Sequence, residues 1–358
     1  MQKGCEYVLH FDYSFLKNGL LPAGFINLVA EIYKMKATAA SQTENCAAIF
    51  TALEKISTVQ SVKSSNEIEG VVTTEERYHV ILQDRNNAVS HNEKEIAGYW
   101  EALSIIQSDC GYLDFDENTI RLLHKTMMNI AGYEYAGQYK ERNNDIIEKD
   151  PNGYRNVRFH PTTATETPEA MKQLILAYSE ARNDSEINQL LLIPCVILDF
   201  LCIHPFKDGN GRISRLLTLL LLYQNKYDVC KYISLEEQIN KRKAIYYSAL
   251  KKSSEGWHEN QNDYIPFMIE FLTELYMSYK ELNQKVGGIG RKKATKQERI
   301  EKAVLDSLKP VSKADISEML PDVSVTTVEA VLGRMIREGK IKKVGAGKKV
   351  RYCAAEAQ

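Results

Sequence analysis

The sequence predicts a mostly α-helical protein that carries a small β-hairpin and ends in a separate α/β domain. Two apolar segments, 187–203 and 213–223, are hydrophobic nearly all round and long enough to be buried helices. Residues 146–149 and 154–159 flank a DPNG turn, which is typical of a β-hairpin. The glycine-rich and then basic segment 286–293, VGGIGRKK, indicates a linker before the C-terminal domain.

The composition limits the class of protein. The 358 residues are 44% hydrophobic, which is enough for a full core and for more than one domain. The seven cysteines form no CxxC pair, so we expect reduced thiols rather than a disulfide framework or a zinc site. No uninterrupted apolar run reaches the length of a membrane span, and the N-terminus lacks the apolar core of a signal peptide. We therefore expect a cytoplasmic protein without a membrane partner.

The N-terminal region, 1–110, has helical patterning throughout. Glu95, Tyr99 and Leu103 follow one another at helical spacing, and we expect them to be core and helix surface.

A helix at about 57–70 in this region ends in the sequence SNEIEG. Ser65 and Glu69 lie four residues apart and therefore share one helical face. Gly70 suits the position after a helix C-terminus, which leaves Glu69 in the last turn, where its charge opposes the helix dipole. We expect another group to offset that unfavourable charge.

Residues 204–215, HPFKDGNGRISR, connect the two apolar segments and form a loop that leads into a helix N-terminus. Gly209 and Gly211 permit a turn that exposes backbone N–H groups to an anion. Arg212 and Arg215 lie three residues apart on one helical face, so we expect both guanidinium groups to converge on one polyanion, such as a phosphate chain.

The same loop contains a candidate metal ligand and a candidate base. Asp208 stands where a single carboxylate could hold Mg²⁺ against those phosphates. His204 is the side chain that can accept a proton near neutral pH. A His-Pro pair and a DGNG turn also occur as plain helix stops, but that alternative leaves two arginines in an apolar helix unexplained.

At every specified position this loop matches HxFx[D/E]GNGRxxR, and the chain thereby resembles the Fic-domain family. The resemblance implies a Fic-type helical core, with transfer of AMP from ATP to a hydroxyl group of a protein. It implies that His204 is the base, that Asp208 holds Mg²⁺ and that Phe206 is a core anchor. The implied phosphate contacts are an anion hole at Gly209, Asn210 and Gly211, and the arginines Arg212 and Arg215.

SNEIEG is similar to the inhibitory motif [S/T]xxxE[G/N] of many Fic proteins, in which the glutamate pairs with the second arginine of the loop. The resemblance therefore implies that Glu69 forms a bidentate ion pair with Arg215 and prevents productive placement of the γ-phosphate. It also implies that the hairpin is a flap that holds the target by strand pairing, and that Tyr246 or Tyr247 lies near the adenine or the α-phosphate. The alternatives are a plain surface hairpin and tyrosines that only pack.

The C-terminal domain, 297–358, follows a linker at 286–296 and is basic. Residues 291–351 contain 16 Lys and Arg against 8 Asp and Glu, a net charge of +8 in a chain whose net charge is −1. Helices are expected at 297–308, 313–320 and 325–338, followed by two short strands around a glycine turn.

This order of elements resembles a winged-helix domain. The resemblance implies that the helix beginning near Thr326 and Thr327 enters a DNA major groove, and that the wing residues meet phosphates. Glu329 and Glu338 dilute the positive charge of that helix, and such domains also bind proteins. The implied wing contacts are Lys348, Lys349 and Arg351.

Together these features predict a protein adenylyltransferase that uses ATP and Mg²⁺ and is inhibited by its own Glu69. The N-terminal region, 1–110, precedes a catalytic core at 111–285, and residues 297–353 are the candidate DNA-binding surface. The expected substrate is a hydroxyl group of a protein, and this protein itself is one candidate. The alternatives are a DNA-binding regulator that senses nucleotides through its Fic region, and an enzyme that transfers another phosphate-containing group or removes AMP.

Overall fold

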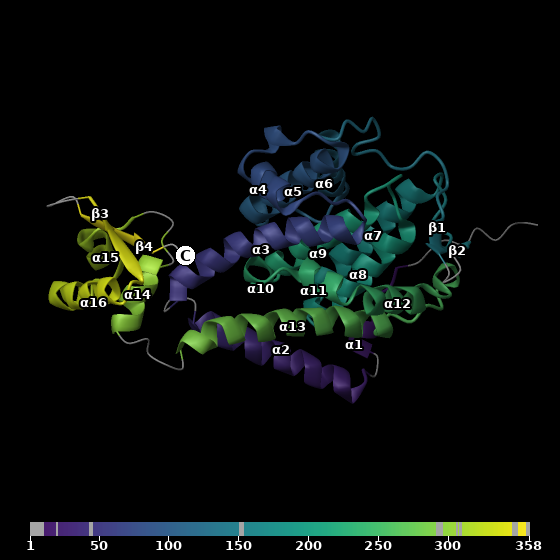
Figure 1. Ribbon diagram of the computed structural model, residues 1–358. Helices are drawn as coiled ribbons and strands as arrows, with labels where there is room; N and C mark the ends of the chain where they lie inside the picture. Colours follow the sequence, from purple (N-terminus) through teal and green to yellow (C-terminus); the bar gives the residue numbers. More distant parts are fainter. Residues whose placement is uncertain are drawn as a thin grey trace, which may run out of the picture. The chain divides into compact units, whose positions relative to one another are not determined.

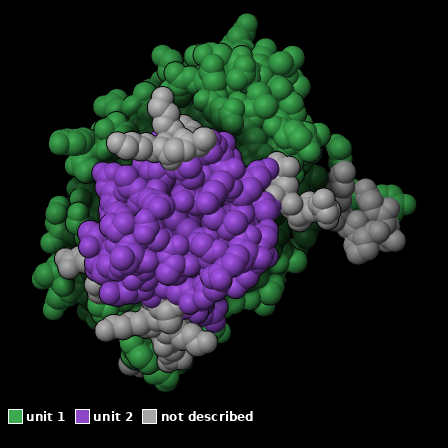
Figure 2. All heavy atoms as spheres, turned by 60° about the vertical axis from the view of Figure 1, so that its left-hand side comes forward, with its two compact units in different colours: residues 1–283 green, residues 284–358 purple. Residues whose placement is uncertain are grey.

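The computed structural model describes residues 11–18, 21–42, 46–149, 154–290, 296–305, 307, 310–345 and 350–355. It confirms a mostly helical fold with two small antiparallel hairpins (Figure 1). The chain divides into two compact units, residues 1–283 and residues 284–358 (Figure 2). Among the described residues, no helix is both long and apolar enough to cross a membrane.

Unit 1 is built from helices and the first hairpin. Its described helices are α1 (Phe15–Asn18), α2 (Ala23–Gln42), α3 (Ala47–Ile68), α4 (Glu75–Gln83), α5 (His91–Asp109), α6 (Glu117–Asn129), α7 (Thr167–Asn183), α8 (Gln189–Ile203), α9 (Asn210–Gln224), α10 (Val229–Tyr232), α11 (Leu235–Lys241), α12 (Lys243–Ser254) and most of α13 (Ile265–Gly290), together with the 3₁₀ turns η2 (Arg85–Asn87) and η3 (Trp257–Glu259). Helix α13 continues through Gly290, so the first part of the expected linker, 286–290, is helical.

The two apolar segments form the centre of unit 1. Helix α8 packs against α7 and α9, and every side chain from Leu190 to Ile203 is buried, because almost all of them are apolar. Helix α9 begins three residues earlier than the sequence predicts, at Asn210. This start places both arginines of the loop inside the helix and close to its N-terminus.

Asp199 is the carboxylate inside buried α8, and three donors surround it. Tyr13 Oη and Trp257 Nε1 each lie 2.8 Å from its oxygens, and Tyr264 Oη lies 3.0 Å from both. Burial raises the pKa of Asp199 to about 7, although these hydrogen bonds lower it. The carboxylate thereby joins the segment before α1 and the start of α13 to the helix that ends at the loop.

Helix α3 is longer than predicted, since it begins at residue 47 rather than near residue 57. Its buried face is rich in serine: Ser57 Oγ donates to Cys230 O at 3.3 Å, and Ser61 Oγ donates to Ser234 Oγ at 3.0 Å. Small polar side chains let α3 lie close against α10 and α11. The contact positions the C-terminal end of α3 against the N-terminus of α9.

The predicted first hairpin is confirmed. Strands β1 (Ile146–Lys149) and β2 (Arg155–Phe159) pair antiparallel, with Ile147 opposite Val157 and an irregularity between Ile146 and Ile147. The DPNG turn lies outside the described residues.

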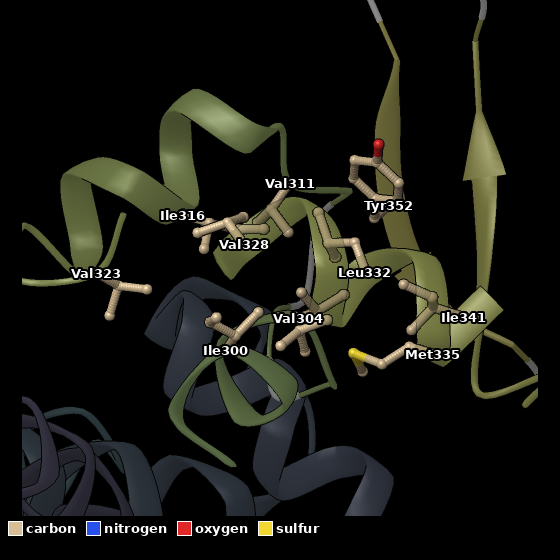
Figure 3. Packing of buried hydrophobic residues seen from close by; sticks show 11 residues of the cluster. Ile300, Val304, Val311, Ile316, Val323, Val328, Leu332, Met335, Ile341 and Tyr352 are labelled. Atoms are coloured by element: carbon tan, nitrogen blue, oxygen red, sulfur yellow. The ribbon is translucent and has the colours of Figure 1, made fainter. Parts of the chain in front are cut away.

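Unit 2 contains α14 (Lys296–Leu305), α15 (Lys313–Met319), α16 (Val325–Arg337) and an antiparallel pair, β3 (Ile341–Val344) and β4 (Arg351–Ala354). Its core is apolar and packs side chains such as Ile300, Leu332 and Tyr352 together (Figure 3). Ser312 caps α15 through a capping box, and Gly339 adopts φ +70° after α16. The expected order of three helices and two strands is therefore present, and the winged-helix assignment stays a prediction.

Candidate active site

The loop between α8 and α9 has an irregular backbone. His204 ends α8 with φ 52° and ψ 59°, and its N–H still donates to Phe200 O at 2.9 Å. Gly209 has φ +80° immediately before α9. A left-handed histidine is strained, whereas a left-handed glycine is not. The loop therefore holds His204 in a conformation that neighbouring groups must stabilise.

Two hydrogen bonds between the Asn210 side chain and the Phe206 backbone hold this loop together. Asn210 Oδ1 accepts from Phe206 N at 2.9 Å, and Asn210 Nδ2 donates to Phe206 O at 2.8 Å. The Phe206 ring is fully buried and stacks on the His124 ring at a centroid distance of 3.7 Å. Phe206 is thus the expected anchor. The Asn210 side chain is used to brace the loop, which leaves only its backbone N–H for an anion.

A cavity of about 450 Å³ opens beside the loop. Its lining comes from the loop and the start of α9, from the end of α3, from the hairpin and from α12. Its lining residues include His204, Asp208, Gly209, Asn210, Gly211, Glu69, Ile147, Arg158, Lys243 and Tyr247. The structure thereby brings together most of the site residues predicted from the sequence.

The imidazole of His204 is arranged to act as a base. Its Nδ1 lies 3.2 Å from Leu201 O, and because a carbonyl oxygen can only accept, Nδ1 carries the proton. Nε2 is then the nitrogen with a free lone pair. Burial lowers the pKa of His204 to about 4, so the ring is neutral at pH 7.

Arg215 is bound by the end of α3. Its Nε donates to Ser65 Oγ at 2.8 Å, and its Nη2 donates both to Ser65 O at 2.9 Å and to Glu69 Oε1 at 2.7 Å. The prediction of a bidentate Arg–carboxylate pair was wrong, because Nη2 bonds one carboxylate oxygen of Glu69 while Nε bonds the Ser65 hydroxyl instead of the second oxygen. Gly70 adopts φ +79° after Glu69, as expected for a residue that ends a helix.

The Glu69 carboxylate also lies against the N-terminus of α9. A Cβ atom placed on Gly211 would overlap Glu69 Oε1, and it would lie 3.2 Å from Cδ. Burial raises the pKa of Glu69, but the charges of Arg215, Arg212 and Lys243 outweigh burial and hold that pKa below its usual range. The carboxylate is therefore ionised, and it lies where an anionic ligand would meet the helix N-terminus.

Residues 114–222 match the family model described as the Fic/DOC family. They contain a Fic domain. The fold is similar to that of a Fic family protein from Desulfovibrio desulfuricans G20, with 19% identity, a TM-score of 0.64, and coverage of 95% of this chain and 98% of that chain. The fold is also similar to that of a Fic domain containing signaling protein from Bacteroides thetaiotaomicron VPI-5482, with 20% identity, a TM-score of 0.61, and coverage of 72% of this chain and 97% of that chain.

A third similar structure is a segment of Fic-1 from C. elegans, with 16% identity, a TM-score of 0.51 and coverage of 74% of each chain. At these identities the similarity shows a shared fold. Proteins with a Fic domain generally transfer a nucleotide or another phosphate-containing group to a protein.

In this Fic domain, Arg212 has a partner that the sequence did not mark. Arg212 Nη1 donates to Glu95 Oε2 at 2.5 Å, and the two side chains are only 3% and 7% exposed. Glu95 also accepts from Tyr133 Oη at 2.9 Å. The expectation that Glu95 is ordinary core or helix surface was wrong: it is a buried carboxylate that neutralises an arginine of the loop. Its helical spacing resembled that of its neighbours, so the sequence held no signal for this role.

The expectation that Arg212 and Arg215 both point at one polyanion site is therefore not met, because protein carboxylates already bind both side chains. Arg212 pairs with α5 and Arg215 with α3, so each has a carboxylate partner. Arg212 keeps free donors, since its buried Nε has no hydrogen-bond partner in the described part of the chain and its Nη2 lies 4.0 Å from Asp208 Oδ2.

Asp208 fits a divalent cation that is also held by phosphate oxygens. Its side chain is 56% exposed and lies at the cavity, and its Oδ1 accepts from Gly209 N at 2.6 Å. Among the described residues, no group of three or more His, Cys, Asp and Glu side chains could hold a metal ion. One carboxylate supplemented by phosphates and water is the donor set that Mg²⁺ commonly uses.

The hairpin and α12 complete the cavity of the Fic domain. Tyr247 lines the cavity, whereas Tyr246 is buried and packs edge-on against Phe267 at a centroid distance of 5.5 Å. Of the predicted tyrosine pair, only Tyr247 therefore lies at the site. Arg158 of β2, which the sequence analysis did not single out, also lines the cavity, and burial lowers its pKa.

Proposed function

We propose that this protein transfers AMP from ATP to a Ser, Thr or Tyr hydroxyl of a protein, and that Glu69 inhibits this reaction. The observation that carries the proposal is that one cavity holds a neutral imidazole and a helix N-terminus suited to phosphates. The acceptor hydroxyl gives its proton to His204 Nε2 while its oxygen bonds to the α-phosphorus. The bond from that phosphorus to the bridging oxygen breaks, and pyrophosphate leaves with the electron pair.

The start of α9 would bind the phosphates. The N–H groups of Asn210 and Gly211 lie where an α-helix has no internal acceptors for them, whereas the Gly209 N–H donates to Asp208 Oδ1 and would have to leave it to bind a phosphate. Arg212 retains the unpartnered Nε–H, which supports a role in phosphate binding. Asp208 would hold Mg²⁺, which neutralises phosphate charge when it is bound.

The hairpin would hold the target protein. Ile147 and Val157 face each other across the two strands, and both side chains are about half exposed, at 49% and 46%. A target segment in an extended conformation could pair with a strand edge and cover these apolar side chains. Glu148 pairs with Lys251 of α12 at 2.8 Å, which fixes the hairpin beside the cavity.

Autoinhibition follows from competition for Arg215 and for the N-terminus of α9. A phosphate bound there would have to displace the Glu69 carboxylate, which is ionised and ion-paired. Ser65 supports the inhibited state because it binds the same guanidinium group. The inhibition is therefore a property of the α3 end as a unit rather than of one carboxylate.

The test compares label transfer from α-labelled and γ-labelled ATP to proteins of a lysate and to the protein itself. Glu69→Gly is expected to raise α-label transfer about 10- to 150-fold, which corresponds to a hydrogen bond to a charged group worth about 1.5–3 kcal/mol. Glu67→Gly is the matched control, because it puts a glycine in the same turn of α3 and leaves Arg215 paired.

His204→Ala in the Glu69→Gly background is expected to abolish the transfer. Persistent α-label transfer in that double variant contradicts the assignment of the base. Transfer of only the γ-label would instead indicate phosphate transfer. Loss of AMP from a pre-labelled protein, without any addition, would indicate removal of AMP.

A specific observation favours DNA binding by unit 2 as a second function. Glu329 pairs with Lys313 at 2.6 Å and Glu338 pairs with Lys340 at 2.8 Å, so the acids of α16 are neutralised. The exposed residues of α16 are then mostly small, and their charges are those of the paired Glu329 and of one cation, Arg337; the others are Val325, Thr326, Ala330 and Gly333. Small residues let a helix approach base edges closely.

Of the predicted wing residues, Lys348 and Lys349 lie outside the described residues, and Arg351 donates to Pro310 O at 3.0 Å. A gel-shift assay with random duplex DNA, at low and at raised salt, tests the proposal. We expect salt-sensitive binding that Arg337→Ala weakens. Absence of any shift at low salt contradicts it and favours a protein partner.

A further inference from the structure

The loop that precedes the hairpin makes contacts on both sides of His204. Lys140 Nζ donates to Ile203 O at 3.1 Å, and Lys140 N donates to Pro205 O at 2.9 Å. Lys140 therefore binds the carbonyl groups of the residues on either side of the histidine, one through its side chain and one through its backbone N–H.

Neighbours of Lys140 extend this contact. Tyr139 forms an isolated antiparallel bridge with Phe206. Asn144 Oδ1 accepts from Lys140 Nζ at 3.0 Å, and Asn144 Nδ2 donates to Phe206 O at 3.1 Å. The segment thus follows the catalytic loop residue by residue, with Lys140 at its centre.

The burial of Lys140 is unusual for a lysine. Its side chain is only 4% exposed, and no carboxylate among the described residues forms an ion pair with it. Burying an ammonium group without a counter-ion is costly, and it lowers the pKa of Lys140 to about 8. A neutral side chain of similar length would fill the same space without this cost. The reason for a lysine at this position therefore lies in the hydrogen bonds that its Nζ donates to Ile203 O and Asn144 Oδ1.

The Ile203 carbonyl belongs to the peptide group that precedes a strained histidine. His204 has φ 52°, a conformation that a non-glycine residue keeps only when its surroundings enforce it. The imidazole can face the cavity only while the neighbouring peptide groups keep this orientation. The Lys140 side chain holds the peptide group before His204, and the Lys140 backbone N–H holds the carbonyl of the next residue, Pro205.

We propose that Lys140 is a positioning residue for the transfer reaction, and that it holds the His204 imidazole at the cavity by binding the carbonyls of Ile203 and Pro205. The proposal deepens the proposed function and rests on His204 being its base. Lys140 itself contacts no reacting atom. Its positive charge has a second consequence, since it lowers the pKa of His204 and helps to keep the ring neutral.

The test uses the full-length protein with Lys140→Met, Lys140→Arg and a matched control, Arg121→Met. Arg121 Nε donates to Gly137 O at 2.8 Å, so it braces the same segment with the same kind of bond, but among the described residues it forms no hydrogen bond or ion pair with residues 203–206. Thermal unfolding checks that each variant is folded.

The first readout is transfer of α-label in the Glu69→Gly background. For Lys140→Met we expect kcat to fall about 10²-fold with little change in KM for ATP, because the base is misplaced while the α9 phosphate site is unchanged. Lys140→Arg keeps a charge and donors, and it is expected to restore part of kcat. Equal loss in Arg121→Met and Lys140→Met overturns the proposal, as does a loss confined to KM.

The second readout does not depend on activity. Protein labelled with ¹³C-histidine is titrated by NMR, and the His204 signal is assigned from its loss in His204→Gln. In Lys140→Met we expect the His204 pKa to rise and the Nδ1–H tautomer to lose its dominance. An unchanged pKa and tautomer overturn the positioning role. If no variant transfers label, the proposed function fails, and this titration alone decides the role of Lys140.

Discussion

The Arg212–Glu95 ion pair in unit 1 and the Lys313–Glu329 ion pair in unit 2 differ in their burial, and the difference separates a buried site from a surface. Arg212 and Glu95 are 3% and 7% exposed, whereas Lys313 and Glu329 of unit 2 are 45% and 49% exposed. A buried charge without a partner is costly, while an exposed charge is solvated whether it is paired or not. In unit 1 the choice of partner for each arginine therefore controls both stability and access by a ligand.

The cores of the two units also differ in the kinds of side chain that they bury. Unit 2 encloses an apolar cluster, and its charged groups lie around it. Unit 1 encloses apolar α8 but also the carboxylate of Asp199 and the two arginines of α9. Buried polar groups of this kind have to be satisfied by specific partners from distant parts of the chain. Their presence in α8 and α9 distinguishes the centre of unit 1 from the apolar core of unit 2.

The largest expected effect comes from removing the partner of Arg212. Glu95→Ala leaves a buried guanidinium group without its carboxylate, and we expect the free energy of unfolding of unit 1 to fall by about 3–5 kcal/mol. Both tryptophans, Trp100 and Trp257, belong to unit 1, so tryptophan fluorescence in a denaturant titration follows this unit alone. A loss below about 1 kcal/mol would show that Arg212 is not held by Glu95.

A core substitution in unit 2 tests whether the two units are independent. Leu332 is 1% exposed, and Leu332→Ala should destabilise unit 2 by about 2–5 kcal/mol through the lost burial and the cavity left behind. Circular dichroism should then show an earlier transition, while the tryptophan transition of unit 1 and the label transfer stay unchanged. A shift of the tryptophan transition would show that the units are coupled.

The pH dependence of stability is the next effect in size. The pKa of His204 is lowered to about 4, so between pH 6.5 and 4 the unfolded chain binds a proton that the folded chain does not. Stability should therefore fall as the pH drops through this window, and His204 should contribute about 2–3 kcal/mol of that fall. Comparison of the free energies of unfolding of the wild type and of His204→Gln across this pH range isolates the contribution of His204. The same slope in both proteins would contradict the lowered pKa.

The smallest effect is expected for a surface pair of unit 2. Glu329→Ala removes the partner of Lys313, and because both side chains are exposed, the free energy of unfolding of unit 2 should change by less than about 1 kcal/mol. The variant should also bind DNA slightly more tightly if α16 faces the duplex, since it removes a negative charge. If Glu329→Ala lowered the free energy of unfolding as much as Glu95→Ala does, the exposed ion pair of unit 2 would not be weaker than the buried pair of unit 1.

Much of the fold could be predicted because it depends on local patterns. The apolar runs of α8 and α9 have the periodicity and length of buried helices, and Gly70 and Gly339 end α3 and α16 with positive φ as expected. The hairpin followed from the turn between its strands. The positions of His204, Asp208 and the loop glycines were predictable for the same reason, since they lie within one continuous segment.

The sequence by itself thus determined which residues lie in the loop between α8 and α9 and which two apolar helices flank that loop. Only the tertiary structure decided the partners: Ser65 shares Arg215 with Glu69, Glu95 neutralises Arg212, and Lys140 bonds the Ile203 carbonyl beside His204. These contacts join residues that are 63 to 150 positions apart in the chain. A helical pattern specifies which face is buried but not which distant polar group meets it, because that depends on how the helices pack and on which buried charges must be satisfied there.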